Sequence, residues 1–270
     1  GDHRDLHSFP TRRSSDLIGG DIDETGGSRS LTIAGSGHTL TLDGANTFSG
    51  GLTYSGGATL KINHASALGS GPFTITNGTI DNTSGSPVVL NTANLQNWNA
   101  NIAFTGSNDL NLGTGAVTIN ANRTVTVSAG TLTVGGGIGQ SGTRTLTKNG
   151  NGTLVLGGAN TYTGNTTVST GTLALVGGSQ NSAITVNSGA TLGLSLNTGS
   201  PATATTTSTK SLTLVAGHAI TVSGTVDNSS DYLLMTAALG ITGTPADPGI
   251  PDYQLTIVDN GGVDELWLEY

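Results

Sequence analysis

The sequence is poor in cysteine, methionine, aromatic residues and charge. Its 270 residues include no Cys and one Met, with 4% aromatic and 10% charged residues. The lack of Cys excludes disulfide bonds and thiolate metal sites. Globular domains typically carry about 25% charged residues, so small polar residues dominate this chain. With 34% apolar residues, it can fill only a narrow core. This composition favours a structural β protein over a compact enzyme.

Charge and hydropathy exclude further classes. The net charge is −8 and the pI is near 4.8, which gives no basic footprint for nucleic acid. No run of 18 apolar residues occurs, so we expect no membrane-spanning helix. Leu, Ile and Val recur steadily, which argues against disorder.

Residues 1–17, GDHRDLHSFPTRRSSDL, differ in composition from the rest. They hold three of the six arginines and two of the five histidines, without alternation. The string resembles a translated sequencing-adapter oligonucleotide, and such segments are excluded from fold reasoning. We expect a non-native, disordered tail here; a genuine basic tail is the alternative. If the gene is cut upstream, the missing signal peptide carries no information about secretion.

From Ile18 onward, short runs alternate apolar and polar residues and are separated by Gly, Asn, Asp and Ser. Such period-two runs predict strands with one buried face. The polar partner is usually Thr, whose branched side chain suits a strand. No helical periodicity with caps is present. The runs are residues 31–33, 39–42, 60–62, 73–75, 117–119, 125–127, 132–134, 154–156, 173–175, 184–186, 192–196, 212–214, 220–222 and 255–257.

The sequence also contains a longer repeat, which includes several of these alternating runs. TLTLDGANTFSG at 39–50 matches TLVLGGANTYTG at 153–164, and each copy continues into a second strand. Glycine in these turns suggests positive φ angles. Strands this short and thin cannot bury themselves singly, but stacked turns of a coil share one continuous core. At about 20 to 25 residues per turn, asparagines at the corners would stack between turns: Asn46, Asn77, Asn82, Asn120, Asn160 and Asn187.

Residues 154–173, with their lead-in at 146–153, resemble the autotransporter-associated β-strand repeat, also called the passenger-associated transport repeat. Residues 39–62 form a weaker copy. The resemblance implies a right-handed parallel β-helix (β-solenoid) in the passenger or stalk of a secreted or surface-anchored bacterial protein. We therefore expect an all-β domain over 18–244. The chain is then either a fragment of a passenger or one of the repeat proteins of this type that lack an outer-membrane barrel.

The C-terminal part differs again. Residues 200–209 read as an exposed polar loop, and the proline-rich residues 243–251 cannot continue a central strand. Larger apolar strands are expected at 232–236, 253–258 and 265–270. We expect residues 245–270 to cap the open end of the stack, since unpaired strand edges promote aggregation.

Some parallel β-helices act on acidic polysaccharides and need clustered carboxylates. Here Asp81, Asp109, Asp227 and Asp231 are scattered, and His38 and His218 are isolated. Asp21, Asp23 and Glu24 could form a loose Ca²⁺ site, although a solvated turn is the simpler interpretation. Asp259, Asp264, Glu265 and Glu269 are expected on the solvated face of the terminal strands. Residues 135–139 are expected to form a plain turn. We expect no catalytic residue, no metal and no cofactor.

Aromatic and threonine positions offer two binding alternatives. Phe48, Tyr54, Tyr162 and Trp98 could stack on sugars, although one aromatic per repeat more often fills the core. Thr-x-Thr runs could form a hydroxyl array for ice or crystalline glycan, but their spacing along the chain is irregular. These runs are Thr39/Thr41, Thr74/Thr76, Thr124/Thr126, Thr131/Thr133 and Thr145/Thr147.

The sequence thus predicts an extracellular structural stalk that supports adhesion, with no catalytic activity, as a monomer. The first alternative is a glycan-binding adhesin module whose partners are host or environmental surface glycans. The second is a polysaccharide-acting enzyme.

Overall fold

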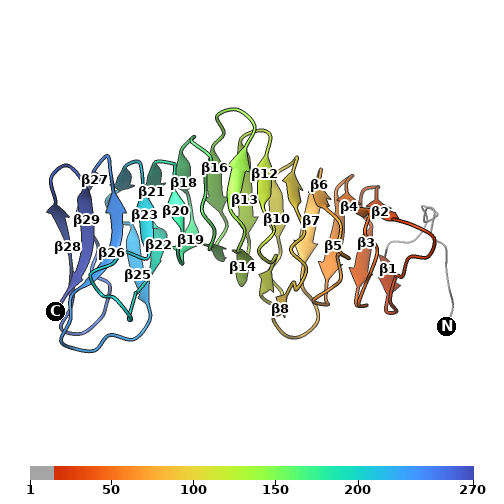
Figure 1. Cartoon of the computed structure of the whole chain (residues 1–270), viewed down its shortest axis with the longest axis horizontal. Helices are drawn as coiled ribbons and strands as arrows, with labels where there is room; N and C mark the ends of the chain where they lie inside the picture. The colour runs from red at the N-terminus through yellow and green to blue at the C-terminus, as the bar shows by residue number, and fades with distance from the viewer. Residues whose placement is uncertain (1–14) are drawn as a thin grey trace.

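A computed structural model describes residues 15–270 of the chain. Within this part there are strands and turns but no helix. Up to β27, successive strands lie on different sides of an elongated column, and each strand hydrogen-bonds to strands from neighbouring turns (Figure 1). The predicted all-β parallel solenoid is confirmed.

Four sheets form the walls of the column. The first sheet contains, in spatial order, β1 (Ser15–Ile18), β3 (Thr39–Leu42), β5 (Ala58–Ile62), β7 (Gly78–Asp81), β10 (Ile102–Phe104), β13 (Arg123–Val127), β16 (Leu146–Asn149), β18 (Thr166–Val168), β21 (Ile184–Val186), β24 (Leu212–Leu214) and β27 (Ile241–Thr242). The second contains β8 (Val88–Val89), β11 (Leu110–Asn111), β14 (Thr131–Val134), β17 (Thr153–Leu156), β19 (Gly171–Leu175), β22 (Ala190–Ser195) and β25 (Ala219–Ser223). The third contains β2 (Ser30–Ile33), β4 (Gly51–Tyr54), β6 (Phe73–Ile75), β9 (Gln96–Trp98), β12 (Val117–Ile119) and β15 (Ile138–Gln140). The fourth contains β20 (Ser179–Gln180), β23 (Thr206–Ser208), β26 (Tyr232–Ala237), β29 (Asp264–Glu269) and β28 (Gln254–Asp259).

The winding is visible in the middle of the column. β12, β13 and β14 lie on the third, first and second sheets, and β15 then returns to the third sheet beside β12. The register pairs Val117 with Ile138 and Ile119 with Gln140. Parallel pairing of this kind lets the backbone groups of an interior strand bond to the turns on both sides.

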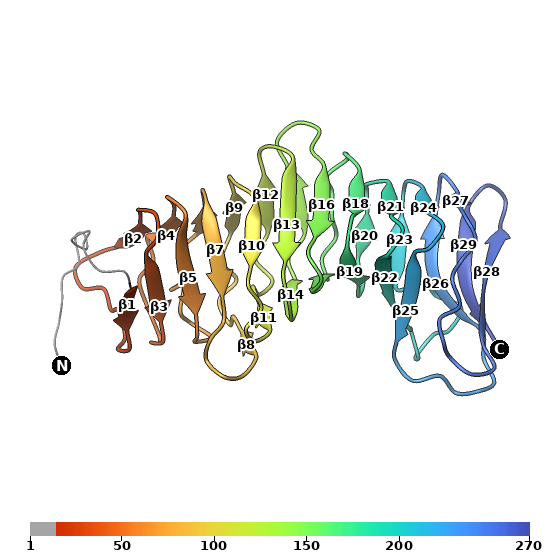
Figure 2. The same ribbon diagram turned by 180° about the vertical axis from the view of Figure 1, so that it is seen from behind.

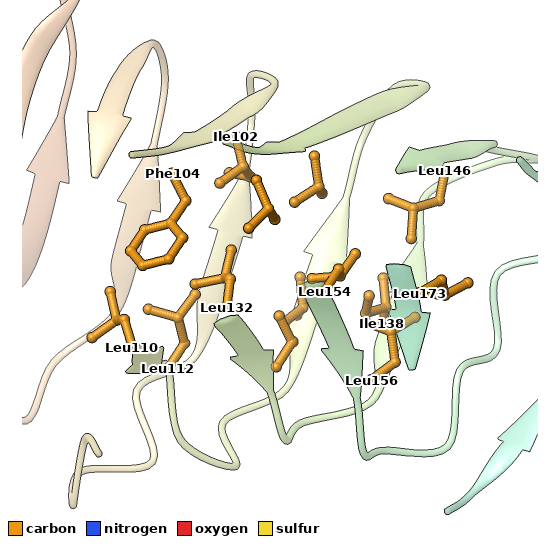
Figure 3. Packing of buried hydrophobic residues seen from close by; sticks show 14 of the residues in the cluster. Ile102, Phe104, Leu110, Leu112, Leu132, Ile138, Leu146, Leu154, Leu156 and Leu173 are labelled. Carbon is orange, nitrogen blue, oxygen red and sulfur yellow. The ribbon is translucent and has the colours of Figure 1, made fainter. Parts of the chain in front are cut away.

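The core is one continuous cluster of apolar side chains that point inward from the different sheets along the axis. In β13 the burial alternates from residue to residue, with Val125 and Val127 fully buried and Thr124 and Thr126 partly exposed. Figure 3 shows Phe104, Leu132 and Leu154, among others, reaching into the space between the sheets. Every predicted alternating run lies in a strand, except that Leu196 follows the end of β22.

The N-terminal boundary differs from the expected one. Residues 1–14 lie outside the described residues, but Ser15–Ile18 form β1 and pair in parallel with Thr39–Leu42. The expected disorder is therefore wrong for residues 15–17. Pairing uses backbone groups alone and is open to any sequence beside an unpaired edge; the Leu17 side chain itself is 68% exposed. An adapter origin of residues 1–17 stays a prediction.

The C-terminal end changes from parallel to antiparallel pairing. β26 pairs in parallel with β23 but antiparallel with β29, and β29 pairs antiparallel with β28. The expected loop at 200–209 is wrong at its end, because Thr206–Ser208 form β23, in which Thr206 and Ser208 are buried. Figure 2 shows this hairpin from behind, at the end of the column.

Candidate functional site

The two sequence copies occupy different walls of the column. Thr39–Leu42 is β3 in the first sheet, whereas Thr153–Leu156 is β17 in the second. Between the copies the chain adds a strand of the second sheet to each turn, beginning with β8. The repeat is therefore a local unit of strand, turn and strand that can stack on any wall.

The asparagine of each GAN turn joins three successive turns. The side-chain oxygen of Asn46 accepts a hydrogen bond from the Ile22 amide at 2.8 Å, and its nitrogen donates to the Ala67 carbonyl at 2.6 Å. Asn160 accepts from the Ile138 amide at 2.8 Å and donates to the Gln180 side chain at 3.1 Å. The predicted contact between side-chain amides of neighbouring turns is present at Asn160, which bonds to Gln180, whereas Asn46 bonds to backbone groups of both neighbouring turns.

The other predicted corner asparagines behave less uniformly. Asn82 is buried and donates to the Asp109 carbonyl in the next turn, at 2.7 Å. Asn120 is exposed and donates to the Asn99 side chain at 2.8 Å. Asn77 and Asn187 lie in the turns directly after β6 and β21.

The four candidate aromatic rings lie inside the column. Trp98, Tyr54 and Tyr162 have 0% exposure and Phe48 has 1%, so none of them can stack on a sugar. The Tyr162 hydroxyl bonds to Thr166 at 2.5 Å, and burial raises the pKa of Tyr162 above its ordinary value. These rings fill the core, as the more common interpretation predicted.

Lys148 is a fully buried cation, 0% exposed. Its ammonium group donates to the carbonyls of Asn149 at 3.0 Å, Gly150 at 2.7 Å and Thr170 at 3.1 Å. Burial lowers the pKa of Lys148 to about 8. The lysine therefore satisfies carbonyls of two stacked turns from inside the core. Sequence reasoning missed this role, because a lone Lys in a polar strand reads as a surface residue.

In the first repeat copy, a buried tyrosine contacts backbone carbonyls, as Lys148 does in the second copy. Ile33 occupies the third strand position, where the second copy has Lys148, and Ile33 pairs with Tyr54 of the next turn. The Tyr54 hydroxyl, which has one hydrogen to donate, contacts the carbonyl oxygens of Ala58 and Thr79. Burial raises the pKa of Tyr54 well above its ordinary value. Each copy thus has a buried side chain with a polar tip near backbone carbonyls, at the ends of β16 and β18 for Lys148 and within β5 and β7 for Tyr54.

Repeat glycines are required by close stacking. A Cβ on Gly164 would lie 2.2 Å from the Arg144 carbonyl oxygen, and one on Gly50 would lie 2.5 Å from the Arg29 carbonyl carbon. Neither residue has a positive φ. The expected left-handed geometry is therefore wrong at these two positions, and the small size of glycine matters instead.

The acidic residues Asp21, Asp23 and Glu24 accept hydrogen bonds, most of them from the neighbouring turn. Asp21 accepts from the Ala45 amide at 2.6 Å and Asp23 accepts from the Thr47 hydroxyl at 3.0 Å. Glu24 accepts from the amides of Arg29 at 2.7 Å and Ser49 at 3.0 Å. Hydrogen bonds from Ser49, and then from Arg29, lower the pKa of Glu24.

The scattered carboxylates and histidines also do not converge. Asp81 holds the Ser107 amide and hydroxyl, Asp109 accepts from the Thr131 amide, and Asp231 accepts from the Tyr270 amide. Asp227 closes a turn, where hydrogen bonds from Ser230 and Ser229 lower its pKa to about 2. His38 lies just before β3, and His218 is buried with its ring beside the Val215 carbonyl.

Across residues 15–270, no group of three or more His, Asp or Glu side chains is arranged to hold a metal ion. At the C-terminal hairpin, Asp264 accepts from the Ile241 amide, Glu265 from the Trp267 indole and Asp259 from the Gly262 amide. Glu269 ends β29 and is partly exposed. Residues 135–137 connect β14 to β15, and Ile138 and Gly139 belong to β15 itself.

Outward threonines line up although their sequence spacing is irregular. Thr124, Thr147, Thr167, Thr185, Thr213 and Thr242 occupy one register position on consecutive strands of the first sheet. The turns between them differ in length, and loops at the corners take up the difference. The threonines therefore align because their strands pair in register, and the number of residues between them in the sequence does not matter.

In the described part of the chain, no helix is long and apolar enough to cross a membrane. A family model of the passenger-associated transport repeat matches residues 31–62 and 146–175. The chain carries two passenger-associated transport repeats. A search of curated proteins and a search of solved structures each found no match. The matched segments include both asparagine turns and, in the second repeat, Lys148.

Proposed function

We propose that this chain is part of the stalk of a bacterial surface or secreted protein and lies outside the cell, where it supports adhesion. Support comes from the two transport repeats on a parallel β-solenoid. The observation that carries the proposal is the use of the polar motif residues: Asn46, Asn160 and Lys148 hold neighbouring turns together. Motif side chains that hold the turns of the column together suit a stalk, whose role is to extend from the cell surface.

We further propose that the chain has no catalytic site and that residues 245–270 cap the column. Most of the carboxylates described above accept structural hydrogen bonds, either from a neighbouring turn, as Asp81 and Asp109 do, or within their own turn, as Asp227 does. In the cap, Asp264 joins β29 to β27 through the Ile241 amide at 2.6 Å. A cap of this kind covers the last turn of a solenoid core.

Adhesion is tested by binding of the purified chain to immobilised mucin and to polysaccharide-coated surfaces. We expect saturable binding that survives Trp98→Phe, because Trp98 is enclosed in the core. Absence of binding to either surface would contradict the adhesive role.

Catalysis is tested separately with pectin, alginate and chitin. We expect no turnover. Turnover that is lost on Asp81→Asn or Asp109→Asn, in a variant that still folds, would overturn the non-catalytic role.

A further inference from the structure

The strand β28 forms an unpaired edge at the C-terminal end of the column. Among the described residues its strand partner is β29, on one side, and β28 ends the strand order of the fourth sheet. Figures 1 and 2 both place β28 at the extreme end of the molecule. The backbone groups on its other side have no strand beside them.

The turn of this hairpin fixes which backbone groups face the open side. Asn260 donates its amide to the Val263 carbonyl at 2.9 Å, and Gly261 and Gly262 between them have φ values of 67° and 95°. This is a two-residue hairpin turn, in which the flanking residues form a hydrogen-bonded pair. Hydrogen-bonded pairs alternate along an antiparallel ladder. Residues 254, 256 and 258 therefore face β29, and residues 255, 257 and 259 direct their N–H and C=O groups to the open side.

The edge has little of the usual protection against pairing. Natural edge strands carry charged side chains, proline or a bulge, whereas β28 reads QLTIVD, has one charge at its end, Asp259, and pairs with β29 in an unbroken register. Leu255 and Ile257 are only partly buried against the core, and Val258 is 41% exposed. The strand is therefore an apolar template for another strand.

We propose that β28 pairs antiparallel with β28 of a second copy of this chain, with Thr256 opposite Thr256 of the partner subunit. A two-fold axis between two antiparallel strands runs perpendicular to the sheet, so opposed side chains lie on the same face. The open-side groups then allow two central registers, one centred on Thr256 and one on Ile257. The second sets Leu255 against the carboxylate of Asp259, whereas the first sets Leu255 against Ile257 and extends the apolar face.

The hydroxyl group of Thr256 is compatible with this register. Its oxygen has no hydrogen-bond partner in the described chain and is covered by the chain's own atoms, so a partner strand reaches it after rotation about χ1. Opposed threonines in antiparallel strands can then hydrogen-bond to each other. The proposed dimer differs from the monomer expected from the sequence, because the sequence alone does not indicate that β28 forms an open edge.

The test is sedimentation equilibrium of the full chain, with two opposite substitutions at the centre of the register. We expect the natural sequence to be a dimer. Thr256→Lys alone and Thr256→Glu alone should each be monomeric, because like charges directly opposed in a sheet repel. An equimolar mixture of the two variants should dimerise again, since each lysine then faces a glutamate.

Thr213→Lys is the matched control, because Thr213 is also an outward threonine but lies in β24 of the first sheet; it should leave the dimer intact. Circular dichroism checks that each variant is folded. A monomeric natural sequence, or a dimer that survives both Thr256 substitutions, would overturn the proposal. A mixture that stays monomeric would overturn the register.

Discussion

The ammonium group of Lys148 donates a hydrogen bond to the carbonyl of Thr170, one turn further along the column, at 3.1 Å. The same group also contacts the carbonyls of Asn149 and Gly150 in its own turn. Burying a charged group in an apolar core carries a large desolvation free energy, and removing its hydrogen-bond partners destabilises the folded state strongly. It ties the corner of one turn to the corner of the next.

Lys148 gives the protein a specific pH dependence. Its folded pKa of about 8 lies below the ordinary lysine value of 10.5. Between these values the unfolded chain binds the proton and the folded chain does not, so this group adds stability as pH rises from about 8. The difference in free energy of unfolding between the natural sequence and Lys148→Met should therefore change in favour of the natural sequence from pH 8 to 9.5. Urea titrations at both pH values measure it, and a pH-independent difference would contradict the assignment.

Gly164→Ala should destabilise the protein by about 1–3 kcal/mol, because the added methyl group must displace a neighbouring carbonyl. The nearest atom, the Arg144 oxygen, would lie at 2.2 Å. Gly139→Ala is the control: its Cβ would meet nothing closer than 3.6 Å, and we expect a much smaller effect. Urea midpoints give the comparison, and equal effects of the two substitutions would argue against the tight stacking.

Asn160→Leu should cost about 1–3 kcal/mol, the usual penalty for leaving a buried polar group unsatisfied. The substitution removes the acceptor of the Ile138 amide and the donor to Gln180. Thr161→Ala, at the adjacent exposed position, is the control and should be nearly neutral. Amide hydrogen exchange at Ile138 should also accelerate in the Asn160 variant alone. Unchanged protection there would contradict the bridge.

Leu154→Ala should lower the free energy of unfolding by about 2–5 kcal/mol, through lost burial and the cavity left behind. Leu154 is 0% exposed, between strands of the second sheet. Val155→Ala, on the outward side of the same strand, should have a smaller effect. Equal losses in thermal or urea unfolding would mean that β17 does not present one face to the core.

Much of the fold could be predicted because period two is visible residue by residue. Leu154 and Leu156 alternate with Val155, and the structure buries the two leucines. The repeat was equally readable, since GAN turns at Asn46 and Asn160 stand in matching contexts. Stacking of short strands followed from the thin apolar face alone, because a single strand of this kind cannot shield itself from water.

Other features depend on which turn lies next to which, and no single segment encodes that. Lys148 is surrounded by polar residues in sequence but meets turn carbonyls only after winding. Thr206 and Ser208 look like part of a polar loop, yet β20 and β26 on either side make them a strand. The close approach at Gly164 likewise arises from a turn some 20 residues earlier.

The central claim is that the chain forms one parallel column, and distances between spin labels test it directly. The chain has no native Cys, so a label at Thr41→Cys in β3 can be combined with one at Thr126→Cys, Thr167→Cys or Thr213→Cys, four, six and eight strands along the first sheet. At about 4.8 Å per strand, the separation along the column is about 19, 29 and 38 Å; Thr41 is offset along its strand from the register of each of the other three sites, which lengthens each distance slightly, and the distances should rise steadily. Distances that do not increase with the number of intervening strands would contradict the column.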